Sequence, residues 1–237
     1  MSLAGLFPID KWNFKSQSIF TNLPEAESAQ LRKHMTEQPY TKGSVLFREG
    51  AVPEGIYFVR EGKVKKFKAD REGREQIIYV ANAGELLGYH AILAEERYPD
   101  SAVALEDSLI AFIPKADFLL TLQQSALLSR RLLQTLSHEF AVLSNSISVF
   151  AHRSVRERLA IALIVLREKY KEPGVPAEET SINISRDDLA NIVGTAKENV
   201  VRFLKEFKLA GILYTSGRQI FIRDVKQLIS ISNYGNR

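Results

Sequence analysis

The pattern of apolar residues changes near Asp117, and this change constrains the fold more than any other feature of the chain. From Tyr40 to about Phe112, short runs rich in Val, Ile, Phe and Tyr alternate with glycines at intervals that suit turns between strands. After Asp117 the apolar residues recur every three or four positions, which is the period of helices. We therefore expect an α+β chain with an antiparallel β-roll or sandwich followed by a mainly helical half.

Two local patterns refine the first half. Residues 16–38 are predicted to form a helix that Pro39 ends. Its apolar anchors are Ile19, Phe20, Leu23 and Leu31. In "GKVKKFK" the apolar residues Val64 and Phe67 are flanked by lysines, which predicts a strand exposed to solvent, and "DREG" is predicted to turn the hairpin.

A long helix is predicted from about Ser125 to Phe150. Spacings of three and four residues define an apolar seam through Leu133, Leu136, Phe140, Leu143, Ile147 and Phe150. A second stripe contains Leu128, Leu132, Val142 and Val149. One stripe can pack on the β-roll and the other on a second copy of the chain, whereas the alternative is a single core helix buried on both sides. We favour a dimer helix, because this helix has more apolar surface than a small roll can cover.

The C-terminal part has the order of a winged helix-turn-helix. A helix over 154–170 begins at Ser154, and the loop 171–180 and the short strand "SINI" follow it. Ser185, with Asp188 three residues later, opens a short helix. The later elements are a tight turn at Gly194 and Thr195, a helix from Ala196 to about Ala210, a cap at Gly211 and a hairpin with Ser216 and Gly217 near its tip. The predicted domains are therefore 1–124, 125–153 and 154–237.

The excess positive charge lies in the same C-terminal part. Residues 1–153 carry 18 basic and 18 acidic side chains, residues 154–237 carry 14 and 10, and residues 196–237 carry 8 and 3. A basic end on a neutral body favours an anionic partner such as DNA or RNA. The second helix of a helix-turn-helix enters the major groove, so Lys197, Glu198 and Arg202 are candidate base-reading residues. The alternative is a surface ion pair between Glu198 and Arg202, which are four residues apart.

Several other classes of protein are not expected. The sequence has no run of about 18 apolar residues and no signal-peptide pattern, so neither membrane insertion nor secretion is expected. It has no cysteine, so disulfides and Cys-ligated metal clusters are excluded. No motif of a hydrolase, zinc protease or P-loop occurs, and we expect no enzyme activity. The histidines have no metal-site spacing; they are His34, His90, His138 and His152. A cytoplasmic location fits these features.

In this order of elements the chain resembles the cyclic-AMP receptor/FNR family of bacterial transcription regulators over nearly its whole length. "KGSVLFREG", "GIYFVREGKVKKF" and "EGREQIIYVANAGELLG" are similar to the family's cyclic-nucleotide-binding-like roll, and "VRERLA" to the helix near its hinge. The most specific piece is "ISRDDLANIVGTAKENVVRFLKEFKLAGIL". The resemblance implies base reading by Lys197, Glu198 and Arg202. It implies contacts near phosphates for Ser185, Arg186, Ala196, Asn199, Ser216 and Arg218, with Ala196 contributing only its backbone.

The chain departs from the family at the effector site. The family's Gly-Glu-Leu and Arg-Ser segments hold the ribose and the cyclic phosphate, but here Gly88 is followed by Tyr89, and Tyr98-Pro99 stands in place of Arg-Ser. Leu143 replaces a polar position on the long helix and Ser144 keeps the next one. Arg97 lies one position early. A buried phosphate without a cation is poorly compensated, so we expect an effector other than cyclic AMP, of unknown identity, and no bound cofactor.

The predicted partners are double-stranded DNA, a second copy of the chain, RNA polymerase and a small-molecule effector, with no membrane. The predicted function is that of a homodimeric regulator on a near-palindromic site. The alternative is an effector-binding roll that acts through a protein partner instead of DNA. Salt-dependent binding to promoter DNA separates the two.

Overall fold

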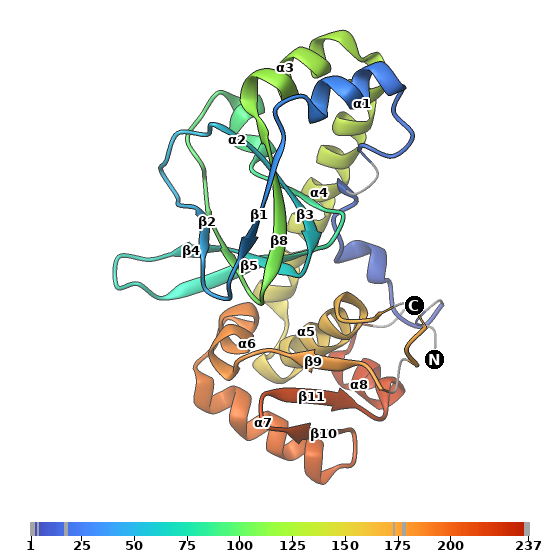
Figure 1. Ribbon diagram of the computed structural model, residues 1–237. Coiled ribbons are helices and arrows are strands. Elements are labelled where there is room, and N and C mark those ends of the chain that lie inside the picture. Colours follow the sequence, from blue (N-terminus) through green and yellow to red (C-terminus); the bar gives the residue numbers. More distant parts are fainter. Residues whose placement is uncertain (1–2, 4, 17–18, 173, 177–178, 235–237) are drawn as a thin grey trace. The chain divides into compact units, whose positions relative to one another are not determined.

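The computed structural model describes residues 3, 5–16, 19–172, 174–176 and 179–234 (Figure 1). The chain forms two compact units, residues 14–140 and residues 1–13 together with 141–237. The long helix α4 (Ala126–His152) runs from the first unit into the second. It begins within one residue of the predicted start and ends two residues after the predicted end.

The unit 14–140 is an antiparallel β-roll, as predicted. Its two four-stranded sheets have the orders β1-β8-β3-β6 and β2-β7-β4-β5. The strands are β1 (Thr36–Tyr40), β2 (Val45–Phe47), β3 (Gly55–Glu61), β4 (Lys63–Ala69), β5 (Glu75–Asn82), β6 (Leu86–Leu87), β7 (Ser101–Ala104) and β8 (Ser108–Pro114). The helices α1 (Glu25–Arg32) and α3 (Lys115–Gln124) lie side by side at one end of the roll, and α2 (Tyr89–Ala94) follows β6 (Figure 1). Apolar side chains from α2, α3, the first part of α4 and the strands share one core.

The helix predicted over 16–38 is shorter than expected. It covers only Glu25–Arg32 and begins after Pro24; residues 17 and 18 lie outside the described part. Thr36–Tyr40 pairs with β8 instead, so Pro39 lies inside a strand and ends no helix. Strand β1 is at the edge of its sheet, where one side has no neighbouring strand. Pro39, which has no backbone N–H, is tolerated there because no hydrogen bond between strands is lost on that side.

The strand β4, which was predicted to be exposed to solvent, is instead largely buried. Strand β4 lies between β7 and β5, and three of its lysines, Lys63, Lys65 and Lys66, are largely buried in ion pairs. Lys63 pairs with Glu106 at 2.9 Å and Lys66 with Asp100 at 3.1 Å. A lysine can lie inside a sheet when an acid on a neighbouring segment compensates its charge, and the local pattern does not contain that acid. The predicted hairpin turn at Asp70–Gly73 is present, with Gly73 at φ 78°.

The second unit contains the predicted helix-turn-helix and wing. Its elements are η1 (Ile9–Lys11), α5 (Val155–Lys169), β9 (Ser181–Asn183), α6 (Arg186–Val193), α7 (Lys197–Leu209), β10 (Leu213–Ser216), β11 (Gln219–Ile222) and α8 (Val225–Ser232). The wing sheet has the order β10-β11-β9. The helix α8, which packs on α5, was not predicted.

The first residues of the chain belong to this second unit, which differs from the predicted domain 1–124. Aromatic contacts explain the difference. The ring of Trp12 lies edge-on to Tyr234 at 5.4 Å, and Phe7 lies 5.8 Å from Tyr234. The long helix likewise forms no separate segment 125–153, because it is divided between the two units at residue 140.

Candidate functional site

The turn between α6 and α7 is held from several sides. The hydroxyl of Ser185 caps α6 by accepting from the Asp188 amide at 2.9 Å. Gly194 adopts the left-handed conformation, with φ 68°, that lets the chain leave α6. Arg158 on α5 donates to the Val193 carbonyl at 2.9 Å and to the Gly194 carbonyl at 3.1 Å. These bonds fix where α7 begins.

Helix α7 has one buried and one exposed face. Val200, Leu204 and Phe207 are buried, whereas Lys197, Glu198 and Arg202 are exposed. The predicted base-reading side chains therefore lie together on the free face of α7. Ala196 is its N-cap and makes no side-chain capping bond, which leaves backbone N–H groups at this end of the helix.

Arg202 contacts Asn199 and Phe203, which is not the surface ion pair with Glu198 that the alternative predicts. The Arg202 guanidinium donates to the Asn199 side-chain oxygen at 3.2 Å and lies 4.3 Å over the Phe203 ring. Asn199 donates in turn to the Thr195 hydroxyl at 3.0 Å. Lys197 forms an exposed ion pair with Asp187 at 2.8 Å. Such exposed pairs are weak, so Lys197 and Arg202 remain available to a partner with higher negative charge.

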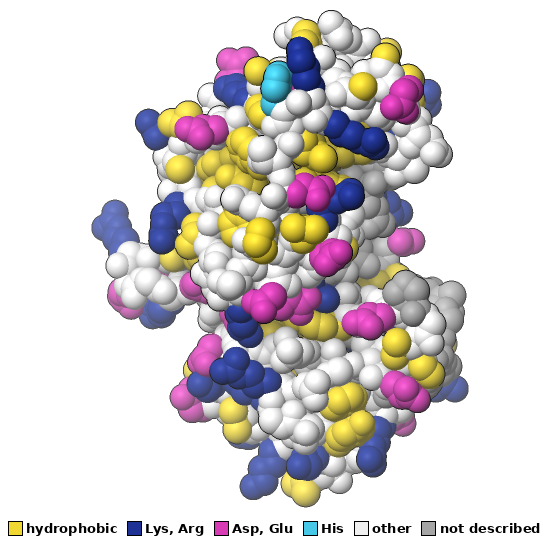
Figure 2. Space-filling model, in the orientation of Figure 1, with side chains coloured by type: hydrophobic (Ala, Val, Ile, Leu, Met, Phe, Trp, Pro, Cys, Tyr) yellow, Lys and Arg dark blue, Asp and Glu magenta, His cyan; other side chains and the backbone are white. Residues whose placement is uncertain are grey.

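The wing is tied to the start of α6. Arg186 donates to the carbonyls of Arg218 at 3.2 Å and Gly217 at 3.3 Å, and burial lowers the pKa of its guanidinium. Two of its donors are thus used inside the protein, and Arg186 positions the wing tip. Ser216 and Arg218 at that tip are exposed. Figure 2 shows Lys and Arg side chains gathered around the α7 and wing end of this unit.

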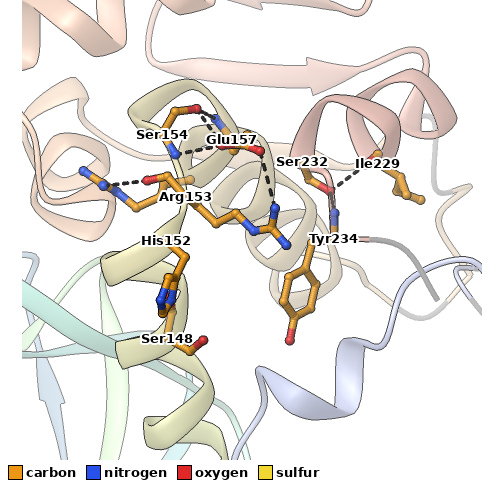
Figure 3. Close-up of polar contacts among 9 residues, drawn as sticks. Ser148, His152, Arg153, Ser154, Glu157, Ile229, Ser232 and Tyr234 are labelled. Carbon is orange, nitrogen blue, oxygen red and sulfur yellow. Dashed lines mark hydrogen bonds and ion pairs between the residues drawn. The ribbon is translucent and has the colours of Figure 1, made fainter. Parts of the chain in front are cut away.

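The connection between α4 and α5 is a tight capped turn (Figure 3). Ser154 and Glu157 form a capping box, in which the Ser154 amide donates to the Glu157 carboxylate at 2.7 Å. Arg153 lies 3.6 Å from the same carboxylate. Arg158 donates to the Arg153 carbonyl at 3.0 Å, so the turn is bonded on both sides.

The two apolar stripes of α4 have different exposures. Leu128, Leu132, Val142 and Val149 are buried. On the seam, Leu133 is 66% exposed, Phe140 73% and Ile147 70%, and Leu143 and Phe150 are also exposed. Leu136 differs from the other seam residues, because it is half-buried and packs against the roll core. The alternative of a single helix buried on both sides is therefore wrong for this chain. The seam therefore presents a large exposed apolar surface.

Aromatic side chains fill the part of the roll where the effector site is predicted. The Tyr98 ring stacks on Phe47 at 4.0 Å, and its hydroxyl donates to the Gly55 carbonyl at 3.1 Å. Gly88 has φ 83°, and a Cβ there would meet the Tyr98 ring at 3.1 Å. Arg97 is exposed and donates to the Gly50 carbonyl at 2.8 Å. Arg97 is thus bonded to the backbone, and Tyr98 occupies the space beside Gly88.

Other members of the predicted effector set lie elsewhere. Pro99 is exposed beside Tyr98, and Leu143 and Ser144 belong to the part of α4 that lies in the other unit. Sequence reasoning missed Glu139, which is buried and bonded to both Tyr89 and His90. The spacing of 49 residues between His90 and Glu139 gives no local signal of this contact. Asp100, which follows Pro99 in the chain, is paired with Lys66.

Among the described residues, no group of three His, Asp or Glu side chains is placed to hold a metal ion. No helix in the described ranges is both long and apolar enough to cross a membrane.

Comparisons with known proteins agree with this geometry. Residues 37–125 match the model of the cyclic nucleotide-binding domain, and residues 157–231 match the Crp-like helix-turn-helix domain. The Anaerobic regulatory protein of Haemophilus influenzae is 30% identical over 197 residues, which cover 83% of this chain and 76% of the relative. The Transcriptional activator protein anr of Pseudomonas aeruginosa is 29% identical over 195 residues, covering 82% and 80%.

Solved structures show the same fold. FixK2 from Bradyrhizobium japonicum is 22% identical, with a TM-score of 0.72, over 83% of this chain and 96% of that one. A CRP/FNR-family transcriptional regulator from Thermus thermophilus is 24% identical, with a TM-score of 0.66, over 84% and 98%.

Proposed function

Because this chain belongs to the Crp/Fnr family of transcription regulators, we propose that it acts as a homodimer on a near-palindromic DNA site. The two recognition helices α7 would enter successive major grooves about 34 Å apart. The observation that carries the proposal is the exposed face of α7, which carries Lys197, Glu198 and Arg202. Ser185 at the start of α6, Asn199 on α7, and Ser216 and Arg218 in the wing would contact phosphates, with Arg186 holding the wing.

The exposed seam of α4 supports the dimer. A surface that includes Leu133, Phe140 and Ile147 loses contact with water when two copies of α4 pair, and this burial is the main driving force of association. The two-fold axis of such a dimer would produce the two-fold symmetry of the DNA site. RNA polymerase is the further partner we propose for the DNA-bound dimer, and the cytoplasm is the proposed location.

The roll would take a modulating small molecule other than cyclic AMP. Tyr98 stands where the family has the arginine that binds the cyclic phosphate, and its ring stacks on Phe47. Arg97 donates to the Gly50 carbonyl instead. We propose no metal and no permanently bound cofactor for this site. The effector would shift the population of dimers that can bind DNA.

The experiment that tests this function is selection of DNA duplexes from a random pool by the purified protein. We expect enrichment of a sequence with two related half-sites, and binding that weakens steeply with salt. Enrichment of no sequence, together with capture of the roll by a protein ligand, would favour the alternative of a protein-binding module.

A further inference from the structure

A cluster of three side chains, of which two are buried and one is half-buried, joins the roll to the long helix. Glu139 on α4 is 2% exposed. One of its carboxyl oxygens accepts a hydrogen bond from the Tyr89 hydroxyl, and the other lies 2.7 Å from Nε2 of His90. Tyr89 and His90 are the first two residues of α2, and their rings stack at 4.1 Å. We call Tyr89, His90 and Glu139 the α2–α4 clamp.

The direction of the hydrogen bond from Tyr89 is fixed. Burial, followed by the charge and hydrogen bond of Glu139 and then by Glu85, raises the pKa of the Tyr89 phenol far above its ordinary value. The phenol therefore keeps its proton near neutral pH and donates to Glu139. Both oxygens of Glu139 have partners within the chain, so the carboxyl group needs no ligand to be satisfied.

The clamp sets the rotation of α4 about its own axis. The side of α4 that faces the roll core consists of Leu128, Leu132, Thr135 and Glu139, which are all buried and are spaced four, three and four residues apart. Leucines alone tolerate a shifted packing, because apolar contact is not directional. A buried carboxyl group with two directed bonds does not tolerate it, since rotation of α4 would leave the group unsatisfied.

The neighbouring residue links this rotation to the proposed dimer. Phe140 follows Glu139 directly and is 73% exposed on the apolar seam. Because successive residues of a helix are about 100° apart, holding Glu139 inward directs Phe140 outward. The clamp thus orients the seam that the proposed dimer uses.

We propose that Glu139 is a positioning residue and that the α2–α4 clamp holds the ligand-free protein in the arrangement that binds DNA. This inference rests on the proposed function and specifies its regulation. A small molecule would modulate the protein by displacing Glu139 from Tyr89 and His90.

The test compares two double variants. Tyr89→Phe with Glu139→Leu removes both partners of the central bond, and the His90 ring, which is 33% exposed, can bond to water instead. Lys66→Met with Asp100→Leu is the matched control, because it removes a similarly buried ion pair from the same unit but away from α4. The single variant Glu139→Gln keeps an acceptor for Tyr89 and should restore most of the wild-type behaviour.

Two measurements decide the inference. Hydrogen exchange of peptides covering residues 89–94 and 126–140 should be at least about tenfold faster in the clamp variant than in the wild type and the control. DNA affinity is measured on proteins refolded from urea, which removes small molecules, with a duplex selected by the native wild type. The refolded wild type should bind as tightly as the native protein, and the clamp variant about tenfold more weakly.

Contrary results are equally clear. A clamp variant that matches the wild type in both measurements, or a control that loses as much affinity, would overturn the inference. A refolded wild type that binds only after a cell extract is added would overturn it as well. If the native wild type selects no DNA sequence, the proposed function fails, and hydrogen exchange alone decides whether the clamp holds α4.

Discussion

At the scale of single residues, the proposed DNA-reading face combines exposed charges with side chains that orient them. Arg202 is exposed, but its guanidinium is oriented by Asn199 and by the Phe203 ring. Arg186 instead donates two hydrogen bonds to backbone carbonyls of the wing. Residues of one type on the same surface are therefore expected to have different roles, one in reading bases and the other in positioning the wing.

Replacing Arg202 with alanine should relax the sequence preference. We expect a loss of about 1–3 kcal/mol at one G·C pair, because the two hydrogen bonds from arginine to guanine are lost. Lys205→Ala is the matched control further along α7 and should weaken binding evenly across sequences. Titrations of the selected duplex and of single-base variants measure both effects. Equal losses for Arg202→Ala on selected and random DNA would mean that Arg202 only positions the protein.

Cyclic AMP should not bind the roll with micromolar affinity. Tyr98 is held by its stack on Phe47 and its bond to Gly55, so it supplies no positive charge to a buried phosphate. Isothermal titration of the purified protein with cyclic AMP and cyclic GMP should give no binding heat. Micromolar binding that tightens DNA affinity would contradict this prediction, and loss of that binding in Arg97→Ala would identify Arg97 as the cation.

At the scale of elements, short-range caps fix the ends of the helices that carry the site. Ser154 and Glu157 cap α5, and Ser185 caps α6. Each cap satisfies backbone N–H groups that have no partner in the first turn of a helix. The start of α5 matters most, because Arg158 in its first turn bonds to the turn before α7.

The α5 cap should make the free energy of unfolding depend on pH in the acidic range. Burial raises the pKa of Glu157, but bonds from the Ser154 side chain and amide and from Asn233, together with Arg153, outweigh it and lower that pKa below 4.5. Because the pKa of Glu157 is lower in the folded protein than in the unfolded chain, its charge stabilises the fold. This stabilisation is complete above pH 4.5 and is lost as the pH falls through the pKa of the folded protein.

Urea unfolding of the wild type and Glu157→Gln tests this dependence. The wild type should be the more stable at pH 7, and the difference should shrink towards about pH 3. Ser154→Ala should cost about 1 kcal/mol at pH 7. A difference between wild type and Glu157→Gln that stays constant over this range would show that the charge of Glu157 does not contribute.

At the scale of the whole molecule, α4 is the element that both units share. Its buried stripe contributes to the cores, and its seam is exposed along most of the helix. Apolar surface of this extent is uncommon on a monomer and is typical of an interface. The oligomeric state is therefore expected to depend on α4 more than on any other element.

Leu136→Asp combined with Leu143→Asp should give monomers in light scattering. Carboxylates placed opposite each other across the two-fold axis would repel and lose their hydration. Leu127→Asp is the matched control, because Leu127 is 38% exposed and Leu143 37%, but Leu127 lies off the seam. A dimer that persists in the double variant would remove α4 from the interface.

The sequence by itself determined the features that rest on local patterns. The glycine-spaced strands, the bounds of α4, the cap at Ser154, the turn at Gly194 and the wing were all predictable, because each depends on residues a few positions apart. The positions of Lys197, Glu198 and Arg202 on one free face of α7 follow from helical period. The relatives confirm the regulator family that these features indicated.

Only the tertiary structure decided the contacts between distant segments. Lys63 and Lys66 of β4 are largely buried because Glu106 and Asp100 reach them from other segments. Thr36–Tyr40 is a strand because β8 pairs with it, although its local pattern continued that of a helix. Glu139 meets Tyr89 and His90 across about fifty residues. The energy of a buried polar group depends on which partner the fold brings to it, and no local pattern of residues specifies that partner.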